Sequence, residues 1–428
     1  MVENKIMEEL KEGWRRDKLE KLTNYIARGI TPKYSENMND MIVINQKCIR
    51  DGKLSLKDSR YHNYNLKKVI NDKILKKYDI LVNSTGVGTL GRVCQNLLDN
   101  KNLTVDTHVT IVRPNSKKIN PIYLGFAMRN NQKFVESLGE GSTGQTELKR
   151  QRLAEEVEIF YPENIETQEK IASILSALDD KIEINNEINK TLEEMAQTLF
   201  KRWFIDFDFP NENGEPYKSS GGKMVDSELG EIPRGWEVNS LMDVCLTINS
   251  GGTPNTKTRE YYGDEINWYS TKELQDKFLL ESEKKITQLG LDKSSAKIFP
   301  KDSILMAIYA APTVGRLGIL IEESAFNQAA VGLVADEVKI SYEYVYLYLL
   351  KERNNLNNLS NGAAQQNLNV SIVKNYKIIV PSKELNQLFK NIISSKFLKI
   401  KKNQQEIQSL TEIRDILLPK LMSGEVEI

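Results

Sequence analysis

The most suggestive chemical pattern in the sequence is a glycine-rich segment. Gly86, Gly88 and Gly91 form a GxGxxG pattern directly after the β-prone run 78–83. In dinucleotide-binding proteins such glycines bring the backbone close to a pyrophosphate at the start of a helix. Here the next residues, RVCQNLL, soon give way to more β-prone sequence. The pattern therefore predicts a tight turn between strands, and we expect no bound cofactor in this chain.

The second half of the chain supports this interpretation, because the sequence is a duplication. Gly13-Trp14 returns as Gly235-Trp236, an offset of 235 − 13 = 222. The segment 29–32 (GITP) returns at the same offset as 251–254 (GGTP). Each repeat is domain-sized and far longer than the roughly 20–50 residues of a solenoid unit. We therefore expect two similar lobes.

The copy of the glycine-rich segment, residues 310–316, reads AAPTVGR and keeps only the last glycine and the arginine. The shared Gly-Arg pair is therefore a structural requirement of the turn. Its arginines, Arg92 and Arg316, either contact phosphate or pair with a carboxylate inside each lobe. The second possibility is favoured, because a residue kept in both lobes cannot make them read different sequences.

Side chains suited to nucleic-acid contact gather in a few segments. Residues 141–148 (GSTGQTEL) match 362–368 (GAAQQNL). Amide side chains read adenine edges, but they also cap turns. Basic side chains neutralise phosphates or form a solvated face. The candidate DNA-binding residues are Arg92, Thr143, Gln145, Lys149, Arg150, Arg152, Lys257, Arg259, Arg316, Gln365, Gln366 and Asn367.

Groups for catalysis or metal binding do not recur between the halves. The only histidines are His62 and His108, and the three cysteines form no CxxC pair. No GxxxxGK[ST] phosphate loop is present, and the segment 120–123 (NPIY) lacks the second proline of an amino-methyltransferase motif. We expect no catalytic residue and no metal site.

The remaining composition is that of a soluble protein. Scattered cysteines are typical of a reducing cytosol, and the first ten residues have no apolar core of a signal peptide. The most apolar stretch, 303–321, contains Pro312 and Arg316 and predicts strands rather than a membrane span. We expect a cytoplasmic protein with no membrane association.

Charge is distributed unevenly along a chain whose net charge is zero. Residues 1–160 contain 28 Lys and Arg against 20 Asp and Glu, a surplus of 28 − 20 = +8. Residues 211–382 contain 18 against 22, which is −4. The first lobe thus has the electrostatic bias of a nucleic-acid binder and the second does not.

Short β-prone runs at 41–44, 78–82, 109–112 and 156–161 lie in the first lobe. They lack a regular strand-helix alternation, which predicts a mixed α/β lobe. After each lobe comes a long helical segment. Residues 166–203 contain no Gly or Pro, and apolar side chains recur at 171, 174, 178, 182, 188, 192, 195 and 199. We expect Thr167 to cap this helix, and Pro419 to stop its second copy, which begins at Lys383.

The spacing of three and four residues, with one step of six across Asn185, predicts that the two helices pair as a coiled coil. Asn185 and Asn403 occupy the same place in the two copies. They are either solvated residues beside the apolar stripe or buried amides that set the register. The predicted seam consists of Ile182, Asn185, Leu192, Leu199, Ile400, Asn403, Leu410 and Leu417.

These features predict an α+β fold with two similar mixed α/β lobes, joined by two long antiparallel coiled-coil helices about a pseudo-two-fold axis. The expected boundaries are a first lobe at 1–163, a first spacer helix at 164–208, a linker at 209–232, a second lobe at 233–382 and a second spacer helix at 383–428.

Several segments, taken in order, resemble the specificity subunits of type I restriction-modification systems. They are EIPRGWEV at 231–238, GGTP at 251–254, ILSALDDKI at 174–182, LFKRWFIDF at 199–207 and LLPKLMSGE at 417–425. The match extends over essentially the whole chain. The first lobe departs from the family pattern, because its opening KEGW at 11–14 lacks the usual proline.

This resemblance implies two target-recognition domains, each reading one half of a bipartite, asymmetric DNA sequence. It also implies partners: double-stranded DNA, two methyltransferase subunits that carry S-adenosylmethionine, and motor-nuclease subunits for cleavage. The chain itself would be non-catalytic. Two alternatives remain open: a coiled-coil scaffold with two protein- or glycan-binding lobes, and a methyltransferase or nuclease with unrecognised motifs.

Overall fold

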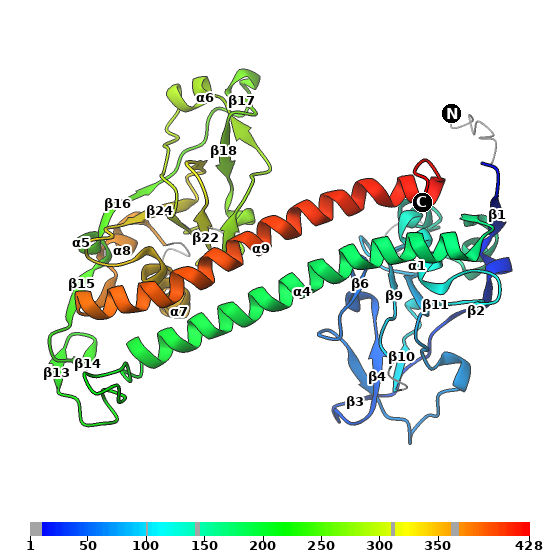
Figure 1. The fold of residues 1–428 in the computed structure, drawn as a ribbon, viewed down its shortest axis with the longest axis horizontal. Helices are drawn as coiled ribbons and strands as arrows, with labels where there is room; N and C mark the ends of the chain where they lie inside the picture. The colour runs from blue at the N-terminus through cyan, green and yellow to red at the C-terminus, as the bar shows by residue number, and fades with distance from the viewer. Residues whose placement is uncertain (1–10, 100–101, 142–145, 310–312, 361–367) are drawn as a thin grey trace. The chain divides into compact units, whose positions relative to one another are not determined.

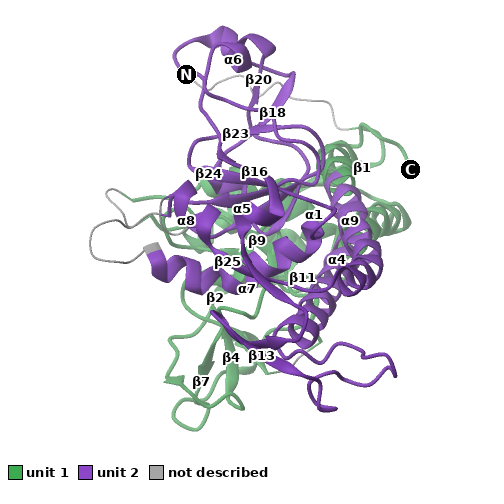
Figure 2. Cartoon of the chain, turned by 90° about the vertical axis from the view of Figure 1, so that its left-hand side faces the viewer, with its two compact units in different colours: residues 1–181, 409–428 green, residues 182–408 purple. Residues whose placement is uncertain are grey.

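The computed structural model describes residues 11–99, 102–141, 146–309, 313–360 and 368–428. The chain forms two compact units (Figure 2): unit 1 comprises residues 1–181 and 409–428, and unit 2 comprises residues 182–408. Each unit contains one lobe of small sheets and short helices, together with parts of two long helices, α4 (Ile165–Phe204) and α9 (Lys383–Ser423) (Figure 1). The predicted duplicated α+β architecture is confirmed.

The lobe of unit 1 is built from twelve described strands and a few short helices. The strands are β1 (Trp14–Lys18), β2 (Thr23–Arg28), β3 (Tyr34–Ser35), β4 (Met41–Ile44), β5 (Ile49–Arg50), β6 (Lys53–Leu54), β7 (Arg60–His62), β8 (Ile80–Asn83), β9 (Val93–Gln95), β10 (Leu103–Val105), β11 (Val109–Pro114) and β12 (Glu158–Pro162). The helices are η1 (Leu19–Leu22), η2 (Gln46–Cys48), η3 (Asn71–Lys73), α1 (Pro121–Asn130), α2 (Gln132–Ser137) and α3 (Arg150–Glu156).

The lobe of unit 2 repeats this order. Its strands are β13 (Met224–Ser227), β14 (Gly230–Pro233), β15 (Glu237–Ser240), β16 (Cys245–Ser250), β17 (Tyr262–Gly263), β18 (Ile266–Tyr269), β19 (Lys277–Leu279), β20 (Lys285–Ile286), β21 (Ile304–Ala307), β22 (Leu317–Leu320), β23 (Ala325–Phe326), β24 (Ala330–Ala335) and β25 (Lys377–Val380). Its helices are α5 (Leu241–Val244), η4 (Arg259–Tyr261), η5 (Thr271–Glu273), α6 (Gln288–Asp292), α7 (Tyr342–Ser360) and α8 (Val370–Asn375).

The sheet topology of the two lobes corresponds, except that the main sheet of unit 2 has one additional edge strand, β19. The main sheet has the order β2-β11-β8-β9 in unit 1 and β16-β24-β21-β22-β19 in unit 2. A second sheet contains a parallel pair in each unit, β4 with β10 and β18 with β23. The first and last strands of each lobe also pair, β1 with β12 and β15 with β25. All four β-prone runs predicted for the first lobe therefore form strands.

The long helices differ from expectation at their ends. Asn164, and not Thr167, caps α4, because its side-chain oxygen accepts the backbone N–H of Glu166 at 2.8 Å. Helix α9 continues through Pro419 to Ser423. A proline costs an internal hydrogen bond, but the last turn carries the buried side chains Leu421 and Met422. Their burial against the lobe of unit 1 holds that turn in place.

Within unit 2, residues 182–204 of α4 lie antiparallel to residues 383–408 of α9. Asn185 Nδ2 donates to Glu406 Oε2 at 3.0 Å, and Asn403 Nδ2 donates to Asn189 Oδ1 at 2.8 Å. Asn185 and Asn403 are both 0% exposed, which settles the open alternative in favour of buried amides. Each amide finds its partner on the other helix, so a slip of one turn would leave both unpaired.

The apolar stripe on α4 differs in part from the predicted one. Ile174, Ile188 and Met195 are exposed, whereas Ala196 and Phe200 are buried. Successive residues of a helix are separated by about 100°. Met195 therefore points well away from the seam that its neighbour Ala196 occupies. None of the eight predicted seam residues is exposed. The buried ones are Ile182, Asn185, Ile400 and Asn403, and the half-buried ones are Leu192, Leu199, Leu410 and Leu417.

Within unit 1, the first turns of α4 meet the last turns of α9. Ile171 and Leu175 of α4 share a core with Leu418 and Leu421 of α9 and with the lobe. Beside this core, Asp179 accepts hydrogen bonds from Arg414 Nη1 at 2.8 Å and from Arg129 Nη1 of α1 at 2.9 Å. One carboxylate thus ties both helices to the lobe of unit 1.

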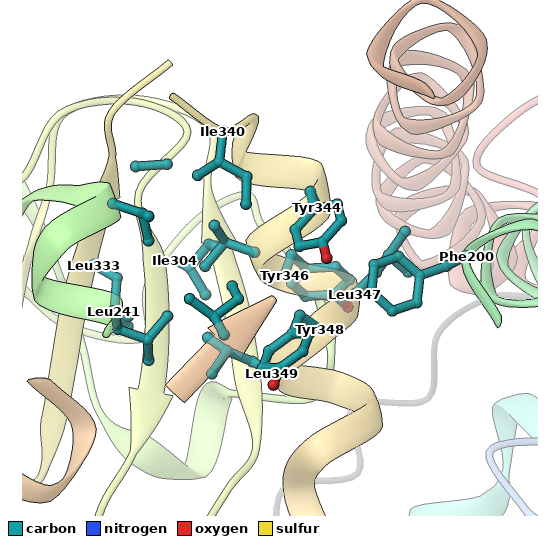
Figure 3. Packing of buried hydrophobic residues seen from close by; sticks show 14 of the residues in the cluster. Phe200, Leu241, Ile304, Leu333, Ile340, Tyr344, Tyr346, Leu347, Tyr348 and Leu349 are labelled. Carbon is teal, nitrogen blue, oxygen red and sulfur yellow. The ribbon is translucent and has the colours of Figure 1, made fainter. Parts of the chain in front are cut away.

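The core of unit 2 is centred on aromatic rings at the end of α4. Phe204 is 1% exposed and packs edge-on against Tyr344 of α7 and Phe389 of α9, with ring centroids 4.7 and 4.8 Å apart. Figure 3 shows Phe200, one turn earlier, pointing at the Tyr344 ring. Trp236, which opens the second lobe, lies 5.8 Å from the Phe204 ring. The repeated Gly-Trp motif therefore anchors the lobe to a helix end.

The segment 209–232, expected as a linker, contains β13 and most of β14, which pair as an antiparallel hairpin. The ring of Phe209 stacks between Tyr217 and Trp236, at centroid distances of 4.6 and 5.1 Å. In the described part of the chain, no helix is long and apolar enough to cross a membrane.

Replacing Phe204 with Ala should lower the free energy of unfolding of unit 2 by about 3–5 kcal/mol, because the truncation leaves a cavity among five aromatic rings. Urea unfolding followed by tryptophan fluorescence measures this, since Trp203, Trp236 and Trp268 all lie in unit 2. Met195→Ala on the same helix, at a side chain 50% exposed, is the control and should change stability by less than about 0.5 kcal/mol. Equal effects of both substitutions would contradict the packing described.

Candidate nucleic-acid interface

In unit 1, a three-residue turn joins β10 to β11, and several neighbouring loops contact it. Asp106 is 3% exposed, and its Oδ1 accepts the backbone N–H of His108 at 2.8 Å. The Asp106 carbonyl accepts the N–H of Val109 at 3.3 Å, which closes the turn. Burial raises the pKa of the Asp106 carboxyl above its ordinary value. Thr107 and His108 are left with their side chains at the surface of this turn.

Backbone hydrogen bonds fix this 106–108 turn to three neighbouring segments. Gly29 has no room for a side chain, because an added Cβ would lie 2.0 Å from the Val105 carbonyl oxygen. The bonds that hold the turn are Asp106 N–H to Ile44 O at 2.9 Å, Ile30 N–H to Val105 O at 2.8 Å, Gly29 N–H to Val109 O at 3.1 Å and Ser84 N–H to His108 O at 2.8 Å.

Unit 2 builds the same turn from Asn327, Gln328 and Ala329. An added Cβ at Gly251 would lie 2.1 Å from the Phe326 carbonyl oxygen, so the close approach is repeated. Asn327 Oδ1 accepts the N–H of Ala329 at 3.2 Å. The matching backbone bonds are Asn327 N–H to Tyr269 O at 2.9 Å, Gly252 N–H to Phe326 O at 2.9 Å, Gly251 N–H to Ala330 O at 3.3 Å and Ile308 N–H to Ala329 O at 2.9 Å.

The side chains displayed by the two turns differ although their backbones match. In unit 1 the exposed His108 ring nitrogen Nδ1 hydrogen-bonds Thr85 Oγ1 at 2.7 Å. In unit 2 the exposed Gln328 side chain accepts a hydrogen bond from the Thr253 hydroxyl. An exposed cluster of hydroxyl, imidazole and amide groups can bind hydrogen-bonding edges, and side chains that differ between the units would bind different edges.

The Gly-Arg motif forms a tight turn beside this site in both units, as predicted. Gly91 and Gly315 have φ of 80° and 79°, a conformation that favours glycine. Gly91 N–H donates to Asn83 O at 2.8 Å, closing the connection from β8 to β9. Arg92 Nη2 donates to the Gly88 carbonyl at 2.8 Å, so it braces the turn. Arg316 is half-buried at the equivalent place.

Two of the other basic candidates form ion pairs with carboxylates, and three have exposed side chains. Arg152 contacts Glu156 at 2.5 Å and Glu140 at 3.1 Å, and these carboxylates raise its pKa. Lys149 also pairs with Glu140, at 2.6 Å. Arg150 begins α3 with an exposed side chain. The exposed Lys257 and Arg259 follow the 251–254 loop of unit 2. Candidates outside the described residues are Thr143, Gln145, Gln365, Gln366 and Asn367.

His62 and the three cysteines are buried or half-buried. His62 is 0% exposed and bridges two backbone groups, with Nδ1 accepting Lys33 N–H at 2.8 Å and Nε2 lying 2.7 Å from Lys67 O. Burial raises the pKa of the Cys48, Cys94 and Cys245 thiols, that of Cys245 to about 12. Protonated thiols are poor nucleophiles. No cluster of three metal-ligating side chains occurs among the described residues.

A family model described as the type I restriction modification DNA specificity domain matches this chain twice, at residues 11–194 and 233–412. The chain belongs to this family. The two matched ranges reproduce the duplication seen in the lobes, and each contains one of the two matching turns.

Individual relatives agree with the family. The chain is 30% identical over 409 residues to the type I restriction enzyme HindI specificity subunit of Haemophilus influenzae, covering 83% of this chain and 88% of that one. It is 33% identical over 314 residues to the MjaIX specificity subunit of Methanocaldococcus jannaschii, covering 72% and 69%. The fold is similar to the crystal structure of a type I restriction-modification S subunit from M. genitalium, with a TM-score of 0.63 at 16% identity over 98% of each chain.

The 106–108 and 327–329 turns were not among the residues predicted from sequence for this specificity-domain family member. A signal for them exists, because Asp106 and Asn327 lie 327 − 106 = 221 residues apart, close to the repeat offset. Both side chains favour the same local turn. The matching loop in front of each turn, which contains Gly29 or Gly251, was recognised as shared, but its role as a close backbone contact requires the structure.

Asp106→Asn should preserve the turn, because Asn327 makes the same bond in unit 2, and should remove the cost of burying a charge. Since burial raises the folded-state pKa of Asp106, the folded state binds more protons above the unfolded pKa of about 3.9, and stability falls as pH rises through this window. The free energy of unfolding of the Asp106→Asn chain, relative to that of the parent, should therefore increase between pH 4 and pH 7 in urea unfolding experiments.

The reverse substitution, Asn327→Asp, is the matched control and should lower stability at pH 7 by roughly 1 kcal/mol. A destabilised Asp106→Asn chain with no pH dependence would show that the carboxylate itself is needed.

Proposed function

We propose that this chain selects the DNA sequence for a type I restriction-modification complex, with each unit reading one half of a bipartite, asymmetric target. The observation that carries this proposal is the pair of turns at 106–108 and 327–329. They share their backbone hydrogen bonds but present different exposed side chains. A common frame with variable side chains suits two lobes that bind the same kind of polymer but read different bases.

The electrostatics are compatible with phosphate binding around these turns. In unit 1, Lys73 Nζ donates to Gly29 O at 2.6 Å and Lys67 Nζ donates to Thr31 O at 3.1 Å. Both ammonium groups are thereby held at the loop that supports the 106–108 turn. In unit 2, the exposed Lys257 and Arg259 follow the equivalent loop. Basic groups beside a reading turn would hold the DNA backbone while the turn meets base edges.

The chain is proposed to have no catalytic activity of its own. Methyl transfer would belong to two methyltransferase subunits that carry S-adenosylmethionine, and cleavage to motor-nuclease subunits. An exposed apolar stripe on α4, formed by Ile184, Ile188 and Met195, supports docking of a partner helix. These side chains are 50%, 36% and 50% exposed and lie four and seven residues apart, so they share one face of the helix.

The complex of this chain with its methyltransferase subunits should methylate adenines within one bipartite sequence when it is offered randomised DNA. Sequencing of the methylated positions yields both half-sites and the gap between them. The methyltransferase subunits alone provide the control and should show no such preference. Absence of sequence-specific retention or methylation by the complete complex would overturn the proposal.

The rival enzyme function makes a different prediction for the chain alone. A methyltransferase would bind S-adenosylmethionine without partners, which calorimetry detects. We expect no binding heat.

The long helices are proposed to set the gap. Inserting four residues into both α4 and α9 adds about 6 Å of helix, which corresponds to one or two base pairs. The sequenced gap should lengthen by that amount while both half-sites stay the same. An unchanged gap in a folded, active complex would exclude this role, and a four-residue insertion in the 209–232 segment is the control.

A further inference from the structure

In the 327–329 turn of unit 2, the Gln328 side chain is not needed to form the turn. Asn327 already accepts the hydrogen bond that closes the turn, and backbone groups make the contacts to neighbouring segments. Gln328, the next residue, is exposed. Its side-chain Oε1 accepts a hydrogen bond from the hydroxyl of Thr253, which lies in the loop that supports the turn.

The Thr253 contact defines how the amide is oriented. A hydroxyl donor must face the oxygen end of the amide, so the Nε2 end points away from Thr253. A carbonyl oxygen has two lone pairs, and one is left after the Thr253 bond. The amide can then present one acceptor and one donor side by side. Adenine offers the complementary pair in the major groove, an N6 donor beside the N7 acceptor.

We infer that Gln328 reads an adenine in the half-site bound by unit 2, and that Thr253 is a positioning residue that orients its amide. This inference rests on the proposed function. The equivalent turn of unit 1 has no glutamine; there the exposed His108, hydrogen-bonded to Thr85 at 2.7 Å, occupies the neighbouring position. The same inference assigns to His108 the contact with a base in the other half-site, so the two units would differ in specificity at this turn.

Nearby groups agree with a base edge at Gln328. The loop that carries Thr253 continues to Lys257 and Arg259, which are exposed and can contact the phosphates that flank a bound base. Tyr309, 38% exposed, follows β21 at the place that Thr85 occupies in unit 1. It gives this side of the turn a partly apolar surface, which suits contact with a base better than with a free ion.

The test uses the full chain in complex with its methyltransferase subunits and a randomised DNA library. Gln328→Ala should reduce the preference for adenine at one position of one half-site by about 5- to 150-fold. The other half-site and the gap should stay unchanged. His108→Ala should relax one position in the opposite half-site. Thr253→Val should relax the Gln328 position alone, by a smaller factor, because the amide remains but is no longer oriented.

Gln387→Ala is the matched control, since Gln387 is an exposed amide on α9 that hydrogen-bonds Asn391 at 2.9 Å. It should leave every position unchanged. All four variants should unfold at the parent's urea midpoint, so that a change in base preference cannot be attributed to a loss of stability. A Gln328→Ala complex with the parent's base preferences would overturn the inference while leaving the proposed function intact. A parent complex without any bipartite preference would instead overturn the proposed function.

Discussion

The close approach of bare backbone at Gly29 and Gly251 is the constraint on which the recognition end of each lobe depends. At both positions a side chain would collide with a carbonyl oxygen of the following turn, at 2.0 and 2.1 Å. Because nothing separates the two chain segments, their N–H and carbonyl groups can bond directly. These bonds attach the 106–108 and 327–329 turns to their neighbours through backbone groups, and only the first side chain of each turn, Asp106 or Asn327, bonds within the turn itself. Geometry and chemistry are thereby separated: the backbone determines position, and the exposed side chains remain to meet a ligand.

A second constraint fixes the register of the two long helices, and it comes from buried polar side chains. Asn185 and Asn403 are wholly buried and each bonds across the helix pair, yet the Oδ1 atom of each lacks a partner among the described residues. Apolar side chains at both places would tolerate several registers. The amides cost free energy when they are misplaced, so they favour one register over its neighbours. A defined register matters for a pair of helices whose length is proposed to set a distance.

The sequence predicted features that depend on periodicity and duplication, and it was less successful where tertiary contacts decide. The repeat offsets identified both lobes, the shared Gly-Arg turn and the matching asparagines. Each of these features occurs in both copies of the repeat, so a pattern seen in one copy could be compared with the other. Thr167 was wrong as the helix cap, since Asn164 lies one turn earlier and reaches the free N–H groups. Pro419 did not end α9, because burial of Leu421 outweighs one lost hydrogen bond. The exposed residues of the turns follow no period, so only the fold brings Thr253 next to Gln328.

The division of the long helices between the units affects how the chain folds during synthesis. The lobe of unit 1 is complete after about residue 162, but its core also contains Leu418 and Leu421, and Lys11 pairs with Glu427 at 2.8 Å. Roughly 250 residues must be translated between these events, which takes on the order of 12 to 50 s at ordinary elongation rates. During that interval the apolar face of the first lobe has no C-terminal helix to cover it. Residues 409–428 therefore complete the core of unit 1 only after the whole of unit 2 has been translated.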